Sequence, residues 1–221
     1  MNLYQLFLNC LRADYTQIEN DGSYSLKKQG NTLYIYLEGS NGKIDWKNNL
    51  DFHPIRLPSG AYKDMSPQWF AHKGFLRVWK SIERHIERDI LDPQYRKIVT
   101  VGYSHGAALA VLCHEFVWFH RPDLRERLEG YGFGCPRVYW GVRRREVVCR
   151  WDRFVVIRNL NDVVTYLPPA WLGFSHVGRI LEIGERGRYS HIDAHRAQCI
   201  LNELKYFSNR NSSALYNGGR I

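Results

Sequence analysis

A serine stands between two glycines in the segment Gly102-Tyr103-Ser104-His105-Gly106. Apolar and β-branched residues precede this segment, and an alanine-rich apolar run follows it at 107–112. The pattern G-x-S-x-G is typical of a tight turn from a strand into a helix, which leaves the serine hydroxyl exposed as a nucleophile. The N-terminus of the following helix favours negative charge at the same point. We therefore predict that Ser104 is a catalytic nucleophile, the alternative being an ordinary glycine-rich turn.

A serine hydroxyl is a weak nucleophile and needs a histidine base, which in turn needs a carboxylate to orient it. Asp162 is a suitable carboxylate, because it follows the apolar strand segment 155–157 within a few residues. Open α/β sheets place their functional groups just past the carboxyl ends of their strands. The competing interpretation is that Asp162 only shapes a turn.

The spacing of apolar residues indicates which elements must position these groups. Apolar residues repeated every three and four positions predict helices over 3–11 and 75–90. The segment 107–120 is apolar over most of its surface, which indicates a buried central helix, and 192–207 is expected to be the last helix. Short β-rich runs predict strands over 24–28, 32–38, 98–103, 131–134, 154–158 and 177–183, whereas 39–72 reads as a long irregular stretch. Alternating strands and helices indicate an α/β domain with a mainly parallel central sheet flanked by helices. We expect a single domain over 1–208 and a flexible tail over 209–221.

The composition excludes several classes of protein. A chain of 221 residues that is 44% hydrophobic is globular rather than disordered, and no apolar run reaches the roughly 18 residues that span a bilayer. The N-terminus lacks the features of a secretory signal, and five cysteines without a C-x-x-C pair argue against disulfides or structural zinc. We expect a cytoplasmic location. The net charge of +9 is compatible with contact to an anionic surface, although the run Arg143-Arg144-Arg145 is better explained as a solvated helix face.

Several motifs resemble those of the class 3 lipase family and occur in the same order along the chain. The nucleophile segment 102–110 resembles the family's G-H-S-L-G-G-A-L-A, and 131–138 resembles its T-F-G-x-P-R-V strand. Residues 161–169 resemble its acid loop N-D-I-V-P-x-L-P-P, 176–178 its H-x-G, and 72–75 its H-x-G-F. The resemblance implies an α/β-hydrolase fold in which Ser104, Asp162 and a later histidine form a catalytic triad. Tyr166, Leu167 and Trp171 flank the acid loop and either line an acyl pocket or pack there.

The same resemblance suggests where an oxyanion would bind. The family has an F-R-G-[ST] segment, to which Leu37-Glu38-Gly39-Ser40 corresponds, with glutamate in place of the arginine. Ser40 and the backbone N–H of His105, the residue after the nucleophile, are the expected oxyanion donors. The segment 43–50 resembles the family's lid but is more polar, since it contains Lys47, Asn48 and Asn49. We expect a reduced lid.

Two histidines compete for the role of the base. The family places this residue just before or within the C-terminal helix, where both His191 and His195 lie. Ser190 is a suitable N-cap, which would place His191 in the first turn of that helix. We therefore predict His191 as the base and retain His195, one turn further on, as the alternative. The four-residue spacing would also suit a metal ion, but a third ligand is not evident and no metal is expected.

The resemblance implies a serine hydrolase that cleaves lipid esters or short to medium acyl esters through an acyl-enzyme, without a cofactor. Two other classes are kept as alternatives: a non-catalytic module with the hydrolase fold, and a basic protein that binds an anionic membrane or nucleic acid. Because no nucleic-acid-reading motif is found, we do not expect nucleic acid as a partner. Peripheral contact with an anionic lipid surface remains an expectation from the charge.

Overall fold

The computed structural model describes residues 2–19, 22–38, 53–56, 70–141 and 148–217, with side chains described up to Ser208. Ser40, the segment 43–50 and the run 143–145 lie outside these residues, so the predictions made for them stay predictions.

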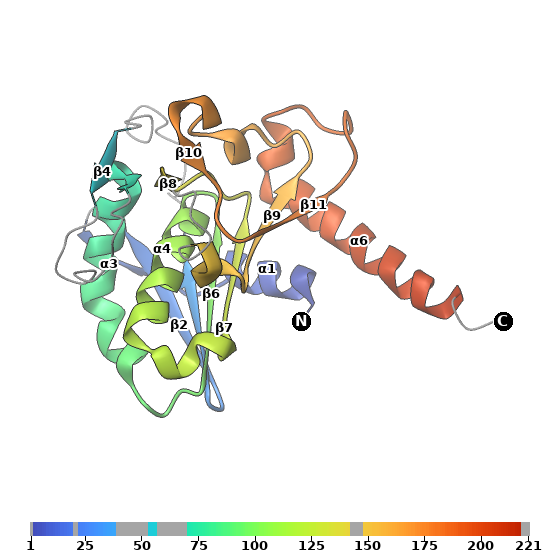
Figure 1. Ribbon diagram of the computed structural model, residues 1–221. Coiled ribbons are helices and arrows are strands. Elements are labelled where there is room, and N and C mark those ends of the chain that lie inside the picture. Colours follow the sequence, from blue (N-terminus) through green and yellow to red (C-terminus); the bar gives the residue numbers. More distant parts are fainter. Residues whose placement is uncertain (1, 20–21, 39–52, 57–69, 142–147, 218–221) are drawn as a thin grey trace.

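A seven-stranded sheet forms the centre of the fold, in the order β1-β2-β3-β6-β7-β9-β11 (Figure 1). The pairs from β3 to β11 are parallel, and β1 and β2 extend the sheet as antiparallel strands, which confirms the predicted mainly parallel sheet. The strands are β1 (Thr16–Gln17), β2 (Ser23–Gln29), β3 (Thr32–Leu37), β6 (Lys97–Tyr103), β7 (Leu128–Phe133), β9 (Phe154–Asn159) and β11 (Arg179–Ile183).

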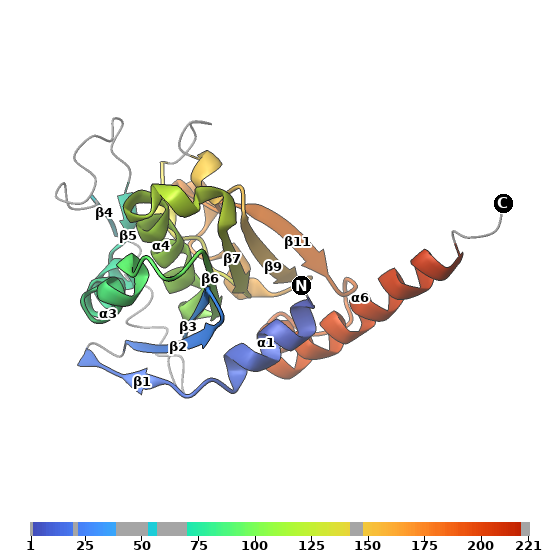
Figure 2. The ribbon, with the colours of Figure 1, turned by 90° about the horizontal axis from the view of Figure 1, so that it is seen from below.

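Helices cover both faces of this sheet, as Figure 2 shows. On one face lie α3 (Lys73–Leu91) and α4 (His105–His120), whose side chains share a core with Leu33 and Ile35 of β3. On the other face α1 (Leu3–Leu11) packs beside α6 (Ala197–Asn217), over Val99 and Val101 of β6. Burial on both faces explains why the central strands read as continuous apolar runs.

A second, smaller sheet takes two of its four strands, β4 and β5, from the stretch that was expected to be irregular. It has the order β10-β8-β5-β4, and its pairs are antiparallel. The prediction for 39–72 is therefore wrong where β4 and β5 form. These strands are too short to show periodicity, and they are stabilised by pairing with distant partners. The four strands are β4 (Pro54–Arg56), β5 (Phe70–His72), β8 (Tyr139–Trp140) and β10 (Phe174–Ser175).

The C-terminal helix begins and ends later than the sequence suggested. A single 3₁₀ turn, η6 (Asp193–His195), precedes it, and Arg196 has an extended backbone that separates this turn from α6. The helix then continues through Asn217, so residues 209–217 of the expected tail are helical. Figures 1 and 2 show its C-terminal end projecting past the sheet.

Two observations bear on the environment of the chain. Within the described ranges, none of the helices combines the length and the apolar character that crossing a bilayer requires. All five cysteines are free thiols. The cytoplasmic location stays a prediction.

Candidate active site

The nucleophile turn joins β6 directly to α4, with Ser104 as its only connecting residue. Ser104 has φ 55° and ψ −122°, a conformation that L-residues rarely adopt, and its N–H donates a 2.9 Å hydrogen bond to the carbonyl of Phe133. A β-carbon at Gly102 would lie 2.0 Å from the carbonyl oxygen of Gly106. The flanking glycines are therefore required by close backbone approach, as the motif predicted.

Asp162 occupies the loop after β9, where the sequence placed it. Its side chain is fully buried, and its Oδ1 accepts a 2.9 Å hydrogen bond from the N–H of Val164. The preceding residue, Asn161, has φ 72°, a left-handed conformation that asparagine tolerates better than most residues. Asp162 Oδ1 does shape a turn, but Oδ2 takes no part in that turn and faces His195.

His195 bridges the nucleophile and the carboxylate. Its Nε2 lies 2.8 Å from Ser104 Oγ, and its Nδ1 lies 2.9 Å from Asp162 Oδ2. The imidazole is buried, whereas Ser104 keeps partial exposure. The three side chains come from the ends of β6 and β9 and from the turn η6, and together they form one continuous hydrogen-bonded chain.

The prediction that His191 would occupy this position is wrong. His191 is exposed, and its Nδ1 lies 3.1 Å from the carbonyl oxygen of Asn161 in the acid loop. Ser190 Oγ accepts a hydrogen bond from the N–H of Asp193, but this bond closes the turn that leads into η6, whose N-cap is Ile192, and does not cap α6. The expected single helix would have placed both histidines on one face, and the 3₁₀ turn separates them. Among the residues described, no group of three potential metal ligands occurs.

Long-range hydrogen bonds hold the base segment, which contains Ala194 and His195, in place. Asn159 Nδ2, at the end of β9, donates a 2.8 Å hydrogen bond to the carbonyl of Ala194. The hydroxyl of Tyr103, at the end of β6, donates a 2.7 Å hydrogen bond to the carbonyl of His195. No motif in the sequence predicted a role for Asn159 or for the hydroxyl of Tyr103. The only available signal was that both lie at the carboxyl ends of strands, beside Ser104 and Asp162.

The acid loop is held by two residues of the family motifs. Arg137 Nη1 donates hydrogen bonds to the carbonyls of Tyr166 and Pro168, the second at 2.9 Å. His176 Nε2 lies 2.7 Å from the carbonyl oxygen of Thr165, and burial lowers the pKa of His176 to about 4. A neutral His176 is therefore a donor to that carbonyl near pH 7.

His105 is the first residue of α4, and its backbone N–H belongs to the N-terminal turn beside Ser104. A helix N-terminus of this kind concentrates N–H groups that lack intrahelical partners. The position suits the oxyanion donor predicted from the motif.

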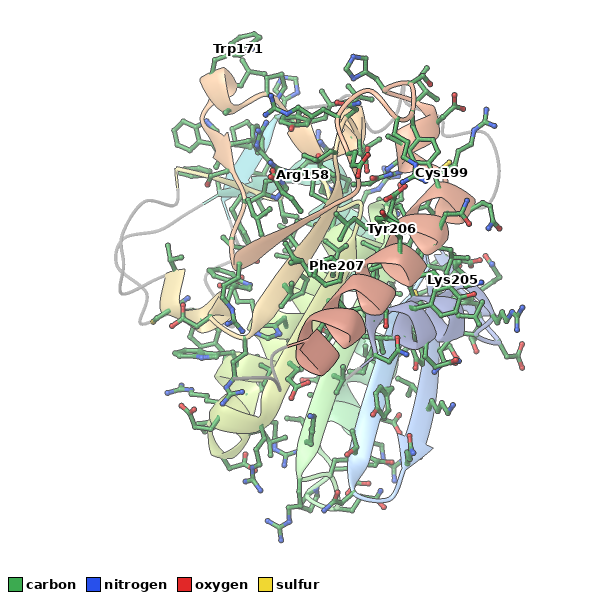
Figure 3. All side chains as sticks on the ribbon, turned by 90° about the vertical axis from the view of Figure 1, so that its right-hand side faces the viewer. Arg158, Trp171, Cys199, Lys205, Tyr206 and Phe207 are labelled. Atoms are coloured by element: carbon green, nitrogen blue, oxygen red, sulfur yellow. The ribbon has the colours of Figure 1, made fainter. Side chains whose placement is uncertain are left out.

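Exposed apolar side chains occur on the segments that carry Asp162 and His195 and on the strand β8. Trp171 is 83% exposed, Ile192 is 73% exposed, and Figure 3 shows Trp171 at the outermost turn of its loop. The expectation that Trp171 packs against the loop or lines a pocket does not fit this exposure. The apolar rim consists of Trp140, Val163, Tyr166, Trp171, Leu172 and Ile192.

Comparisons with known proteins agree with this geometry. The chain is 32% identical to a lipase of Rhizomucor miehei over 160 residues, which cover 66% of this chain and 40% of that protein. The solved structure of the triacylglyceride lipase of Rhizomucor miehei has a TM-score of 0.67 at 27% identity, covering 78% of this chain and 66% of the other.

A second solved structure is that of a triacylglycerol lipase whose catalytic centre is formed by a serine protease triad. It has a TM-score of 0.68 at 28% identity and covers the same shares of the two chains. The chain thus spans less than half the length of its curated relative and about two thirds of these solved chains. The model of the family Lipase (class 3) matches residues 34–171, which is more than half of the chain. With its α/β-hydrolase fold, the chain belongs to the class 3 lipase family.

Proposed function

We propose that the chain is a carboxylic ester hydrolase with Ser104 as nucleophile, His195 as base and Asp162 as the orienting acid. The observation that carries this proposal is the hydrogen-bonded chain from Ser104 Oγ through both ring nitrogens of His195 to Asp162 Oδ2. A serine, a histidine and a buried carboxylate in this order activate the hydroxyl for attack on a carbonyl. Family membership and the triad of the similar triacylglycerol lipase support the same activity.

In the acylation step, Ser104 Oγ attacks the ester carbonyl carbon while His195 Nε2 takes the hydroxyl proton. Buried Asp162, hydrogen-bonded at Nδ1, holds the imidazole in the required orientation and stabilises its protonated form. The tetrahedral intermediate then expels the alcohol, which receives the proton from His195. The acyl group remains on Ser104 as an ester.

In the deacylation step, His195 removes a proton from water, and the resulting hydroxide attacks the acyl carbon. The proton returns to Ser104 Oγ as the carboxylic acid leaves, so the enzyme is restored. In both steps the developing oxyanion would be stabilised by the backbone N–H of His105, with Ser40 as the proposed second donor.

We propose lipid esters at an interface as the substrate class, in preference to small esters in solution. The support is the apolar rim, in which Trp171 and Ile192 expose most of their surface to solvent. Large apolar side chains that are exposed on the segments of a site commonly mark contact with a lipid or a partner. An ester embedded in a lipid surface would thereby be brought to Ser104.

We further propose that an anionic lipid surface is preferred. Exposed Arg186, Arg188 and Arg196 lie on the same segment as Ile192, and the whole chain carries a net charge of +9. Arg188 and Arg196 also form ion pairs with Glu203 and Asp193, whereas Arg186 forms none among the described ion pairs. Arginine side chains near a membrane surface are attracted by anionic head groups. Apolar insertion and this attraction would act together at the rim.

Covalent labelling with a fluorophosphonate probe tests the activity directly. The wild-type chain should take one label, at Ser104, and should hydrolyse a p-nitrophenyl ester, whereas Ser104→Ala should fold normally and do neither. A second serine, Ser190, is exposed but has no histidine partner within the described hydrogen bonds, so Ser190→Ala is the matched control and should label as the wild type does. An unlabelled wild-type protein that is correctly folded would exclude the enzyme and favour a non-catalytic module.

A further inference from the structure

Tyr103, the residue before the nucleophile, contacts His195 in two ways. Its hydroxyl donates a 2.7 Å hydrogen bond to the His195 carbonyl, and its ring stacks on the imidazole with 5.4 Å between centroids and 25° between planes. The same residue therefore holds both the backbone and the ring of His195. Burial, followed by the negative charge of Asp162, raises the pKa of the Tyr103 hydroxyl, which remains protonated and able to donate.

The hydrogen bond from the Tyr103 hydroxyl fixes the carbonyl of His195, which would otherwise lack a helical partner. His195 ends the turn η6, and α6 begins only at Ala197. Asn159 holds the preceding carbonyl, that of Ala194, from β9. Side chains from the ends of two strands thus hold consecutive carbonyls of the base segment.

Aromatic packing holds the ring of Tyr103 in place. Its ring makes an edge contact with Phe7 of α1 at 5.4 Å between centroids, and Phe7 stacks on Phe133 at 4.4 Å. The carbonyl of Phe133 in turn accepts the hydrogen bond from the N–H of Ser104. Because α1 lies outside the matched residues 34–171, this support comes from a part of the chain that the family model does not include.

We infer that Tyr103 is a positioning residue for catalysis, which acts through its contacts with the backbone and ring of His195 and sets the distance from Nε2 to Ser104 Oγ. The inference rests on the proposed function, since the base it positions is His195. The family motif that 102–110 resembles has histidine at this place, and a histidine has no hydroxyl with which to make the contact of Tyr103.

The test is Tyr103→Phe, which keeps the ring and removes the hydroxyl. We expect kcat per titrated active site to fall about tenfold with KM within about twofold, a loss of about 1.4 kcal/mol in transition-state stabilisation. Normalising to sites titrated with the fluorophosphonate removes any contribution from unfolded protein. Tyr103→Leu, which also removes the ring, should lower kcat further.

Tyr15→Phe is the matched control, because the hydroxyl of Tyr15 donates a hydrogen bond of the same 2.7 Å length to a backbone carbonyl, that of Cys10, which is not part of the site. It should lower the melting temperature by an amount similar to Tyr103→Phe and leave kcat unchanged. A Tyr103→Phe variant with kcat within twofold of the wild type overturns the inference, even if its melting temperature falls.

A readout that does not need turnover separates this inference from the proposed function. The imidazole proton between His195 and Asp162 should give a downfield proton NMR signal, assigned by its absence in His195→Ala. Tyr103→Phe should shift or broaden that signal, and Tyr15→Phe should not. An unlabelled, inactive wild type would reject the hydrolase, whereas an unchanged signal in Tyr103→Phe would reject the positioning role.

Discussion

The carbonyl oxygen of Leu37, at the end of β3, lies 2.1 Å from the place where a β-carbon at Gly106 would stand. The first turn of α4 therefore packs directly against the backbone of the neighbouring strand. This contact brings the end of β3 against the N-terminus of α4, whose first residue, His105, is a proposed oxyanion donor.

Gly106→Ala should disrupt this contact, because backbone on either side cannot move by the required amount without shifting β3 or α4. We expect a melting temperature lower by several degrees or more and few titratable sites. Gly30→Ala is the control: Gly30 has φ +57°, but nothing lies within 4 Å of its β-carbon position, so it should show only a backbone cost of about 1 kcal/mol. Equal stability of the two variants would contradict the steric argument.

Alanine at each histidine should separate the two candidates for the base. His195→Ala removes the partner of both Ser104 and Asp162, and kcat should fall by roughly 10⁴-fold or more. His191→Ala removes only an exposed side chain that contacts the acid loop, and kcat should fall by about tenfold at most. The measurement is kcat per folded protein for each variant. The reverse order of effects would restore His191 as the base.

The buried carboxyl of Glu115 should make folding stability depend on pH. It accepts hydrogen bonds from Tyr139 and Arg150, but burial outweighs them and raises its pKa from 4.5 to about 7. The folded state then binds the proton more tightly than the unfolded state. The stabilisation associated with that proton is complete below about pH 4.5 and is lost as the pH rises through about 7.

We expect Glu115→Gln to remove this dependence, so that the difference in unfolding free energy between wild type and variant changes between pH 5 and pH 8. The difference is the quantity to measure, because His114 and His176, whose pKa values burial lowers, act in the opposite sense: their contribution is present above about 6.5 and is lost as the pH falls towards 4. A difference that stays constant over this range would show that Glu115 does not titrate there.

Substitution in the apolar rim should weaken binding to lipid vesicles. Trp171→Ala and Ile192→Ala each remove a largely exposed apolar side chain, and each should lower partitioning into anionic vesicles by roughly tenfold or more. Tyr206→Ala is the control, since Tyr206 is also exposed but lies on α6, away from Trp171 (Figure 3). Hydrolysis of a dissolved short-chain ester should be unaffected in all three variants.

The contribution of positive charge to vesicle binding can be tested at low ionic strength. Arg186→Gln should reduce binding to anionic vesicles at low ionic strength and have little effect on binding to neutral ones. Equal loss on both kinds of vesicle would assign Arg186 a structural role instead.

The positions of Ser104 and Asp162, the proposed nucleophile and acid, could be predicted from the sequence because local geometry determines them. Ser104 stands in a turn whose tightness requires Gly102 and Gly106, so the motif itself carries the steric information. Asp162 lies three residues past the end of β9, and parallel strands bring such positions to one edge of the sheet. The apolar periodicity of α3 and the almost wholly apolar sequence of α4 similarly predicted which helices would accompany them.

The base could not be chosen in the same way. His191 and His195 are four residues apart, and local propensity allowed one continuous helix to carry both. Hydrogen bonds from Tyr103 and Asn159, about 92 and 35 residues away from the carbonyls they hold, stabilise the 3₁₀ turn instead and delay the start of α6 until Ala197. Only tertiary structure decides which histidine faces Ser104, because the bonds that separate the two conformations join residues far apart in the chain.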